Sequence, residues 1–404
     1  MWIANFFVAA SATMVLPFIS LYIETFGNFS DVYVQRWAGY IFGITFLVAF
    51  FAAPIWGRFG DKYGRKSILL LTGYGIAICI LCMGFAKSVE SLFFIRLLMG
   101  IVTGFIPTAT ALISAQSAKK DAGDKLGTLQ TGTVSGGLFG PMLGGLLADT
   151  AGYFLTFIIT SGVIAAATTL VWLGIKEVIY TDKNESHQQY SSKETLLFIF
   201  KRPVLILIIG ISMIIQTANF SIQPLLALYV NQLNQSENIA FLAGMAFSAT
   251  GLGNLIATRK WGQYGDRIGH EKIVLLLLIL SACFFIPQAF VTSIWQLIIL
   301  RFLFGMQIGG LIPCMTAYIR QVCPVSMQGE ILGYHISFRF LGNVIGPVMG
   351  GITASLFNIS SVFIVSGVLF IISAFILWVI LQRERLCPCH PSKEEKVKQP
   401  ATLD

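Results

Sequence analysis

The segment GPMLGG (residues 140–145) recurs as GPVMGG at residues 346–351, 206 positions later. Three further pairs follow in the same order at nearly the same offset: LPFISLY (16–22) with QPLLALY (223–229), Gly57 and Asp61 with Gly262 and Asp266, and RLLMGIVTG (96–104) with RFLFGMQIG (301–309). Several independent matches in one order indicate an internal duplication. The chain therefore consists of two similar halves.

The composition indicates that lipid is the solvent of both halves. Hydrophobic residues make up 55% of the 404 positions and charged residues only 11%, whereas a soluble protein has roughly a quarter charged residues. So much apolar surface does not fit into a globular core in water. The CxxC formed by Cys79 and Cys82 lies in an apolar run, so packing is favoured over redox or metal chemistry. Cys387, Cys389 and His390 offer too few ligands for zinc, and we expect neither a metal nor a cofactor.

Apolar segments long enough to cross a bilayer as helices divide the chain into six spans, a linker and six more spans. We predict these spans at 2–23, 36–56, 67–86, 90–115, 126–148, 152–175, 203–230, 239–258, 272–291, 294–319, 331–355 and 358–381. The fold class is therefore an all-α integral membrane protein, with 12 transmembrane helices in two pseudo-symmetric six-helix bundles. The predicted domains are a bundle at 1–175, a cytoplasmic linker at 176–201, a bundle at 202–381 and a cytoplasmic tail at 382–404.

The N-terminal run favours a retained helix over a cleaved signal peptide. VAASATM offers a weak cleavage site, but no basic segment precedes it and the apolar run continues to Ile23. Because the run starts so near Met1, the sequence leaves open whether a few cytoplasmic residues precede it.

Lysine and arginine set the expected orientation. With the N-terminus inside, the outer loops hold only two of the 27 basic residues, Arg36 and Lys87, and three more fall within spans. The others lie in the inner loops at 57–66, 116–125, 259–271 and 320–330, in the linker and in the tail. This bias predicts cytoplasmic N- and C-termini. The basic charge is thus a topology signal, and no nucleic-acid partner is expected.

The repeated motifs resemble those of the major facilitator superfamily, and specifically its twelve-helix drug:proton antiporter family of bacterial multidrug efflux pumps. The resemblance covers essentially the whole chain. Three family signatures are matched: the loop between helices 2 and 3 by Gly57, Asp61, Gly64, Arg65 and Lys66; helix 4 by Arg96, Gly100 and Gly104; and the antiporter motif of helix 5 by Gly127, Gly136, Gly140, Pro141, Gly144 and Gly145. The family associates the helix 5 signature with efflux, and the resemblance implies a bacterial plasma membrane.

The helix 5 motif also has a direct physical interpretation. Gly136, Gly140 and Gly144 recur every four residues and form one smooth face, which lets helices approach closely. Pro141 removes a backbone hydrogen bond and bends the helix. Because helix 11 repeats the pattern, we predict that these faces lie at the interface between the halves. A static packing face is the alternative.

The charged segment GRFGDKYGRK (57–66) is predicted to form a conformational latch. Its glycines permit a tight turn. By resemblance, the Asp61 carboxylate faces the N-terminus of helix 11, near residues 330–333, and holds the cytoplasmic side shut in the outward-open state. Positive charge at a helix N-terminus favours such a contact. Lys62 and Lys66 serve as topology signals.

Three further parts of the latch are expected. Arg65 pairs with Asp121 or Asp124, and Glu330 competes with Asp61 for the helix start. In the second copy, Asp266 forms a weaker latch with the start of helix 5, because His270 and Glu271 replace the two basic residues.

Candidates for proton coupling are Asp61, Arg96, His335 and Arg339. Arg96 and its repeat Arg301 lie inside helices 4 and 10, where an arginine needs water, a carbonyl or a carboxylate. Snorkelling to the outer surface is the alternative. His335 and Arg339 share a face of helix 11, since they are four residues apart. A histidine here either carries a proton or forms a hydrogen bond in the core.

No Asp or Glu lies deep within a predicted span, which argues against obligate binding of cations. Aromatic, methionine and amide side chains remain to line a pocket for amphiphiles. The candidates are Asn5, Phe6, Phe18, Gln216, Asn219, Phe220, Gln223, Met306 and Gln307. Lipid contact or packing is the alternative for each.

The sequence therefore predicts a secondary active transporter that exports amphipathic, drug-like compounds in exchange for protons. Its expected partners are small-molecule drugs, protons and the lipid bilayer, and we expect a monomer. An uptake or metabolite transporter of the same fold is the first alternative. A membrane enzyme is disfavoured because no catalytic constellation is present. A non-transporting receptor would not need glycine-rich interfaces in both halves.

Overall fold

The computed structural model describes residues 1–117, 122–175, 192–233 and 238–386. The helices are α1 (Trp2–Met14), α2 (Ile19–Glu24), α3 (Asp31–Tyr63), α4 (Arg65–Gly84), α5 (Val89–Val102), α6 (Phe105–Gln116), α7 (Ala122–Gly174), α8 (Ser192–Phe200), α9 (Pro203–Ser221), α10 (Leu226–Leu233), α11 (Ile239–Ile268), α12 (His270–Phe285), α13 (Ile294–Val322), α14 (Val325–Leu356) and α15 (Ile359–Leu386). Short 3₁₀ turns, η1 (Leu16–Phe18), η2 (Gln223–Leu225) and η3 (Ile286–Phe290), join some of them. In these residues the fold is all-helical, as predicted.

Ten stretches in the described residues are long and apolar enough to cross a membrane. One of them, within α7, contains two spans, because Gly152 breaks the helix with a φ of 78°. The 32-residue α14 is absent from the ten, but it is long enough to span. Counting α7 twice and adding α14 gives the twelve predicted spans.

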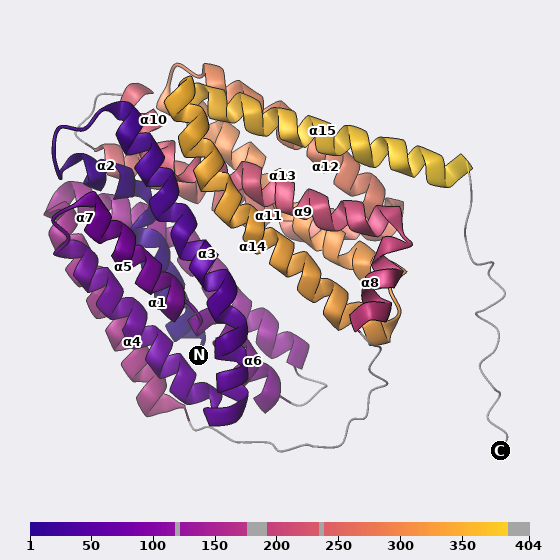
Figure 1. Cartoon of the computed structure of the whole chain (residues 1–404), viewed down its shortest axis with the longest axis horizontal. Coiled ribbons are helices and arrows are strands. Elements are labelled where there is room, and N and C mark those ends of the chain that lie inside the picture. The colour runs from indigo at the N-terminus through magenta and orange to yellow at the C-terminus, as the bar shows by residue number, and fades with distance from the viewer. Residues whose placement is uncertain (118–121, 176–191, 234–237, 387–404) are drawn as a thin grey trace.

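The two halves form separate bundles that lean against each other (Figure 1). Within the first half α7 packs along α1, and within the second α14 packs along α9. Most contacts between the halves come from two pairs of helices: α11 with α7, and α14 with α3. These pairs are repeats of each other, as the duplication requires.

The bundles meet at one end and separate towards the other (Figure 1). We call the end that holds Glu24, Asp149 and Ile239 the converging end. The end that holds Gly64, Gly269 and the start of α14 is the diverging end.

Proline and glycine punctuate both halves at equivalent places. Pro17 and Pro224 lie in the 3₁₀ turns η1 and η2, which interrupt the first and seventh spans. Gly64 and Gly269 have φ values of 92° and 106° and connect α3 to α4 and α11 to α12. Only glycine adopts such a conformation readily. Of the glycines that were expected to form the tight turn, Gly64 does so, whereas Gly57 and Gly60 are helical.

Two predicted loops proved to be largely helical. The segment 57–66 was expected as a loop, but α3 continues to Tyr63 and only Gly64 leaves the helix. Likewise α11 continues through most of 259–271, to Ile268. Charged residues end an apolar span but not a helix, because they are good helix formers beyond the lipid. In the predicted linker 176–201, residues 192–200 form α8, and 176–191 lie outside the described residues.

Candidate functional site

The predicted binding residues of the first span pack within their own half. Asn5 is fully buried and its Nδ2 donates to Thr133 Oγ1 at 3.1 Å. Phe6 stacks on Trp2, with 5.7 Å between ring centroids. Phe18 is also fully buried and stacks on Tyr153 at 5.4 Å, where it fills the core near the converging end.

The candidates of the second half are more varied. Gln216 Nε2 donates to Asn343 Oδ1 at 3.1 Å, which ties α9 to α14. Phe220 contacts Phe46 of α3 edge-to-face at 5.3 Å and so bridges the halves. Three more candidates of this half are half-buried: Asn219, Gln223 and Met306.

Gln307 lies on α13 and is 5% exposed. Its Nε2 donates to the carbonyl of Leu303 one turn earlier, at 3.2 Å. The nine candidates thus do not gather around one described cavity in this conformation. Their role in binding stays a prediction.

Two arginines are buried in equivalent positions of the two halves. Arg96 is 4% exposed, and its guanidinium lies 5.6 Å from the centre of the Phe42 ring. Arg301 is 2% exposed and lies 5.9 Å from the ring of Phe363. In the described residues neither has a carboxylate partner, and each has two nitrogen atoms without a hydrogen bond. Neither guanidinium snorkels to the protein surface here.

The buried His335 and the half-buried Arg339 form a second polar group, on α14. His335 is 1% exposed, and its Nε2 has no hydrogen-bond partner among the described residues. The Nε of Arg339 also has none. An unsatisfied buried nitrogen is costly, so a hydrogen-bond partner such as water would be stabilising beside this pair.

The smooth glycine face of the antiporter motif lies inside the first half, so our prediction of an interface between halves is wrong for these residues. A Cβ on Gly136, Gly140 or Gly144 would overlap the carbonyl oxygens of Phe6, Ala10 and Met14 of the first helix, respectively. The sequence shows the smooth face but not which neighbour it meets. A Cβ on Gly127, at the start of the motif, would meet no atom of the described residues within 4 Å.

The interface between halves uses the neighbouring face of the same helix. A Cβ on Gly145 would overlap the carbonyl of Ala240 in α11, and one on Gly244 would overlap the carbonyl of Pro141. The duplicated pair α3 and α14 repeats both contacts: Gly351 meets the carbonyl of Gln35, and Gly39 that of Pro347. Four glycines therefore let the backbones of the two halves touch at the converging end.

Hydrogen bonds from side chains add to the backbone contacts at both interfaces. Asp149, one turn beyond Gly145, accepts hydrogen bonds from the backbone N–H groups of Ala240 at 3.3 Å and Phe241 at 2.7 Å. In the second interface Arg36 Nε donates to Ser355 Oγ at 2.9 Å. The sequence analysis missed these residues as contacts. The signal was available, because Asp149 and Ser355 align when the two GP-x-x-GG segments are superimposed.

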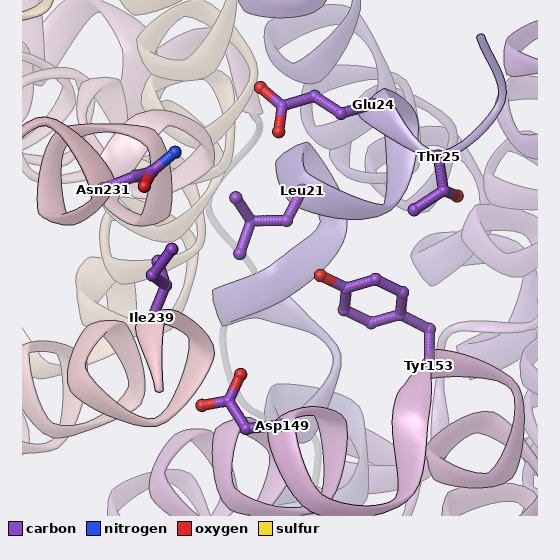
Figure 2. Close-up of a pocket in the computed structure, with 7 residues that line it drawn as sticks. All are labelled: Leu21, Glu24, Thr25, Asp149, Tyr153, Asn231 and Ile239. Atoms are coloured by element: carbon purple, nitrogen blue, oxygen red, sulfur yellow. The ribbon is translucent and has the colours of Figure 1, made fainter. Parts of the chain in front are cut away.

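A cavity of about 330 Å³ lies beside Asp149. It is lined by Leu21, Glu24, Thr25, Asp149, Tyr153, Asn231 and Ile239. Figure 2 shows the Asp149 carboxylate between Ile239 of the second half and Tyr153 of the first, with Glu24 across the cavity. Both halves thus contribute to the walls of this cavity at the converging end.

The residues of the predicted latch lie at the diverging end, and the latch itself stays a prediction. The side chains of Asp61, Asp121 and Asp124 lie outside what the structure describes. Arg65 donates to the carbonyl of Ala111 in α6. A Cβ on Gly57 would have no atom of the described residues within 4 Å.

The expected partners of the latch need one correction. Residues 330–333 do not start helix 11, because α14 begins at Val325. Glu330 therefore lies in the second turn, beyond the free N–H groups, and accepts from Tyr334 Oη at 3.0 Å. Asp266 contacts His270 Nε2 at 3.3 Å, within its own half.

Twelve spans in two repeated bundles, joined by glycine contacts at one end, define a membrane transporter of the major facilitator fold. The sequence model of the Major Facilitator Superfamily matches residues 1–259 and 217–403. The chain belongs to this family.

Named relatives support the assignment. The chain is 58% identical to the uncharacterized MFS-type transporter YuxJ of Bacillus subtilis (strain 168) over 380 residues, covering 94% of this chain and 97% of that protein. It is 39% identical to the multidrug resistance protein MdtG of Serratia proteamaculans (strain 568) over 388 residues, covering 95% and 93%.

Solved structures show the same fold at low identity. The nucleoside transporter NupG superimposes with a TM-score of 0.78 at 12% identity, covering 94% of this chain and 98% of that one. A bacterial homologue of the human lysosomal transporter Spinster, in an inward-facing and unoccupied conformation, gives 0.77 at 14% identity, covering 94% of each chain.

Proposed function

We propose that this protein is a proton-coupled exporter of amphipathic, drug-like compounds from the bacterial cytoplasm. The observation that carries the proposal is the paired backbone contact of Gly145 with Ala240 and Gly351 with Gln35, confined to one end of the molecule. Such a joint closes one side of the membrane and leaves the other open. This is the arrangement that alternating access between two halves requires.

The basic residues indicate which side of the membrane each end of the molecule faces. Lys62, Lys66 and Lys125 lie near the diverging end, whereas the converging end has Arg36 and Lys87. By the positive-inside rule the diverging end faces the cytoplasm, with both termini. The structure then corresponds to an inward-open state in the plasma membrane.

The relatives named multidrug resistance protein MdtG favour export of drugs over uptake. The antiporter motif in α7 supports the same direction through the family resemblance. The apolar and amide candidates, of which Phe220 already touches Phe46 of the other half, suit amphiphiles whose shapes differ. The protein acts as a transporter and not as an enzyme.

Proton coupling requires a group that changes charge during the cycle. We take His335 as the candidate, since it is titratable and its Nε2 is buried beside Arg339 with no hydrogen-bond partner among the described residues. Arg96 has no carboxylate partner among the described residues. Proton coupling through an arginine–carboxylate pair at that position would therefore need an acid that does not contact Arg96 in this conformation.

A drug-susceptibility panel tests the function. Cells that express the protein should tolerate several unrelated amphiphiles better than matched cells without it, and an uncoupler should remove the difference. Inside-out vesicles should then accumulate the same compounds when the lumen is acidified. Accumulation with the opposite gradient only, or by right-side-out vesicles, would instead identify an uptake transporter.

A further inference from the structure

The first turn of α11 has no side-chain cap from its own N-cap residue, Asn238. The first N–H groups of any helix lack partners within the helix. Two of them here, at Ala240 and Phe241, donate to the carboxylate of Asp149 from the opposite half. The carboxylate also benefits from the positive end of the helix dipole. A helix of one half is therefore capped by an acid of the other.

The duplicated interface lacks this arrangement. The helix α3, which corresponds to α11, is capped by its own Ser30, whose hydroxyl accepts from the N–H of Tyr33 at 3.3 Å. Ser355, which corresponds to Asp149, accepts from Arg36 instead. A carboxylate–helix contact between the halves thus exists in one of the two interfaces. The two interfaces differ in the N-cap residue, in the presence of Arg36 and in the residue at the position of Asp149.

We propose that Asp149 is the gate residue that holds the converging end closed, and that its release from α11 permits this end to open. The proposal rests on the alternating access proposed above. Gly145 and Asp149 hold the same turn of α11, one through backbone contact and the other through charge. When the halves separate, Ala240 and Phe241 lose their acceptor, and α11 has no capping side chain at Asn238 to replace it.

The cavity beside the contact makes the release reversible. Its lining residues Glu24 and Thr25 are exposed, so water reaches the edge of the contact while the end is still closed. Water can replace the two N–H donors for Asp149, and the acid can replace water again when the end closes. Glu24 lines the same cavity (Figure 2) and has no hydrogen bond to α11 among the described residues.

Distance measurements between spin labels test the proposal without any substrate. One pair, at Lys87 and Phe290, spans the converging end, and a second, at Lys62 and Gln321, spans the diverging end; all four positions are exposed. In Asp149→Ala the ratio of converging-end-closed to converging-end-open molecules should fall about fivefold, the usual effect of removing a helix cap. In Asp149→Asn this ratio should fall less, because the amide oxygen of asparagine still accepts a hydrogen bond. Glu24→Ala is the matched control and should keep the wild-type ratio.

A rescue variant separates gating from general stability. Ser355→Asp places a carboxylate beside Arg36, where a charge-assisted hydrogen bond is stronger than the present one. Ser355→Asp alone should raise the ratio of converging-end-closed to converging-end-open molecules. In the double variant Asp149→Ala/Ser355→Asp it should return this ratio towards the wild-type value. The proposal is overturned if a folded Asp149→Ala keeps the wild-type distances, if Glu24→Ala shifts them equally, or if Ser355→Asp does not restore them. Should Asp149→Ala not fold, Asp149→Asn and Ser355→Asp alone must shift the ratio in opposite directions. Because these distances do not depend on transport, they remain informative even if the exporter proposal fails.

Discussion

Gly145 of α7 lies against the carbonyl oxygen of Ala240 in α11, so closely that no side chain fits between the two helices. The duplicated pair, Gly351 and Gln35, has the same relationship, with the carbonyl oxygen 2.6 Å from a Cβ placed on the glycine. These contacts join the halves only where the bundles converge. Glycine at these positions is therefore a condition for closing this end.

Gly145→Ala should shift the protein towards a state in which the converging end is open. A methyl group would overlap the carbonyl of Ala240. Overpacking of this kind costs roughly 1–3 kcal/mol, which shifts a conformational ratio by about fivefold or more. Cysteines introduced at Thr25 and Asn231 should then react faster with membrane-impermeant reagents. Gly137→Ala is the control, because no atom of the described residues lies within 4 Å of a Cβ there. Equal reactivity in the two variants would argue against the gating role of Gly145.

Gly140→Leu should insert normally and block transport, but through a different contact. Its side chain would collide with Ala10 and Thr13 of α1 within the same half. We therefore expect a lower unfolding temperature, corresponding to roughly 1–3 kcal/mol, together with loss of transport. Gly137→Leu, on the open face of the same helix, should retain both the wild-type unfolding temperature and transport. Full transport by Gly140→Leu at normal expression would contradict the close packing of α7 on α1.

His335→Ala should uncouple transport if His335 carries the proton. Downhill movement of drug should continue, whereas accumulation against a gradient should be lost, because the variant has no titratable group at this site. The measurement is uphill transport in inside-out vesicles from pH 6 to 8. His335→Gln serves as a control that keeps hydrogen bonding without the charge change. Normal uphill transport by both variants would assign the residue to packing.

Asp61→Asn should shift the population towards the inward-open state and lose most transport, while Asp266→Asn should lose less. The structure moves the expected target of Asp61 to the first turn of α14 at Val325. A contact of a carboxylate with a helix N-terminus is worth about 0.3–2 kcal/mol, enough to change a conformational ratio several-fold. Distances across the diverging end provide the measurement. Wild-type ratios in Asp61→Asn, or a larger defect in Asp266→Asn, would refute this latch.

Cys323 should react slowly with maleimides in the folded protein. Burial raises the pKa of its thiol to about 11, although nearby Arg202 acts in the opposite direction. The thiolate is the reactive form, so at pH 7.5 alkylation should be slower than that of an ordinary thiol by roughly a hundredfold or more, and it should accelerate as the pH rises. The same thiol in unfolded protein is the reference. Rapid labelling of folded protein at neutral pH would contradict this burial.

The duplication, the twelve spans and the tight turn at Gly64 were predictable from the sequence. Repeated motifs are direct evidence of two halves, an apolar run has a length that lipid thickness dictates, and a glycine turn follows from local sterics. Helix ends were less predictable. The α3 helix passes through the charged residues before Gly64, because leaving the lipid does not oblige a helix to end.

The contacts between helices depended on the tertiary structure. The glycines at 136, 140 and 144 indicated a smooth face by their spacing, but only packing showed that α1, and not the other half, occupies it. Spacing defines a face of one helix, whereas its partner depends on how all the helices are arranged.

The gate at the converging end shows the same division most clearly. The sequence by itself determined that Asp149 and Ser355 hold equivalent positions in the two halves and differ in charge. Only the tertiary structure decided that Asp149 meets the first turn of α11 and that Ser355 meets Arg36. The physical reason is that a hydrogen bond between residues 91 positions apart depends on the relative placement of two bundles, which no local pattern in either segment encodes.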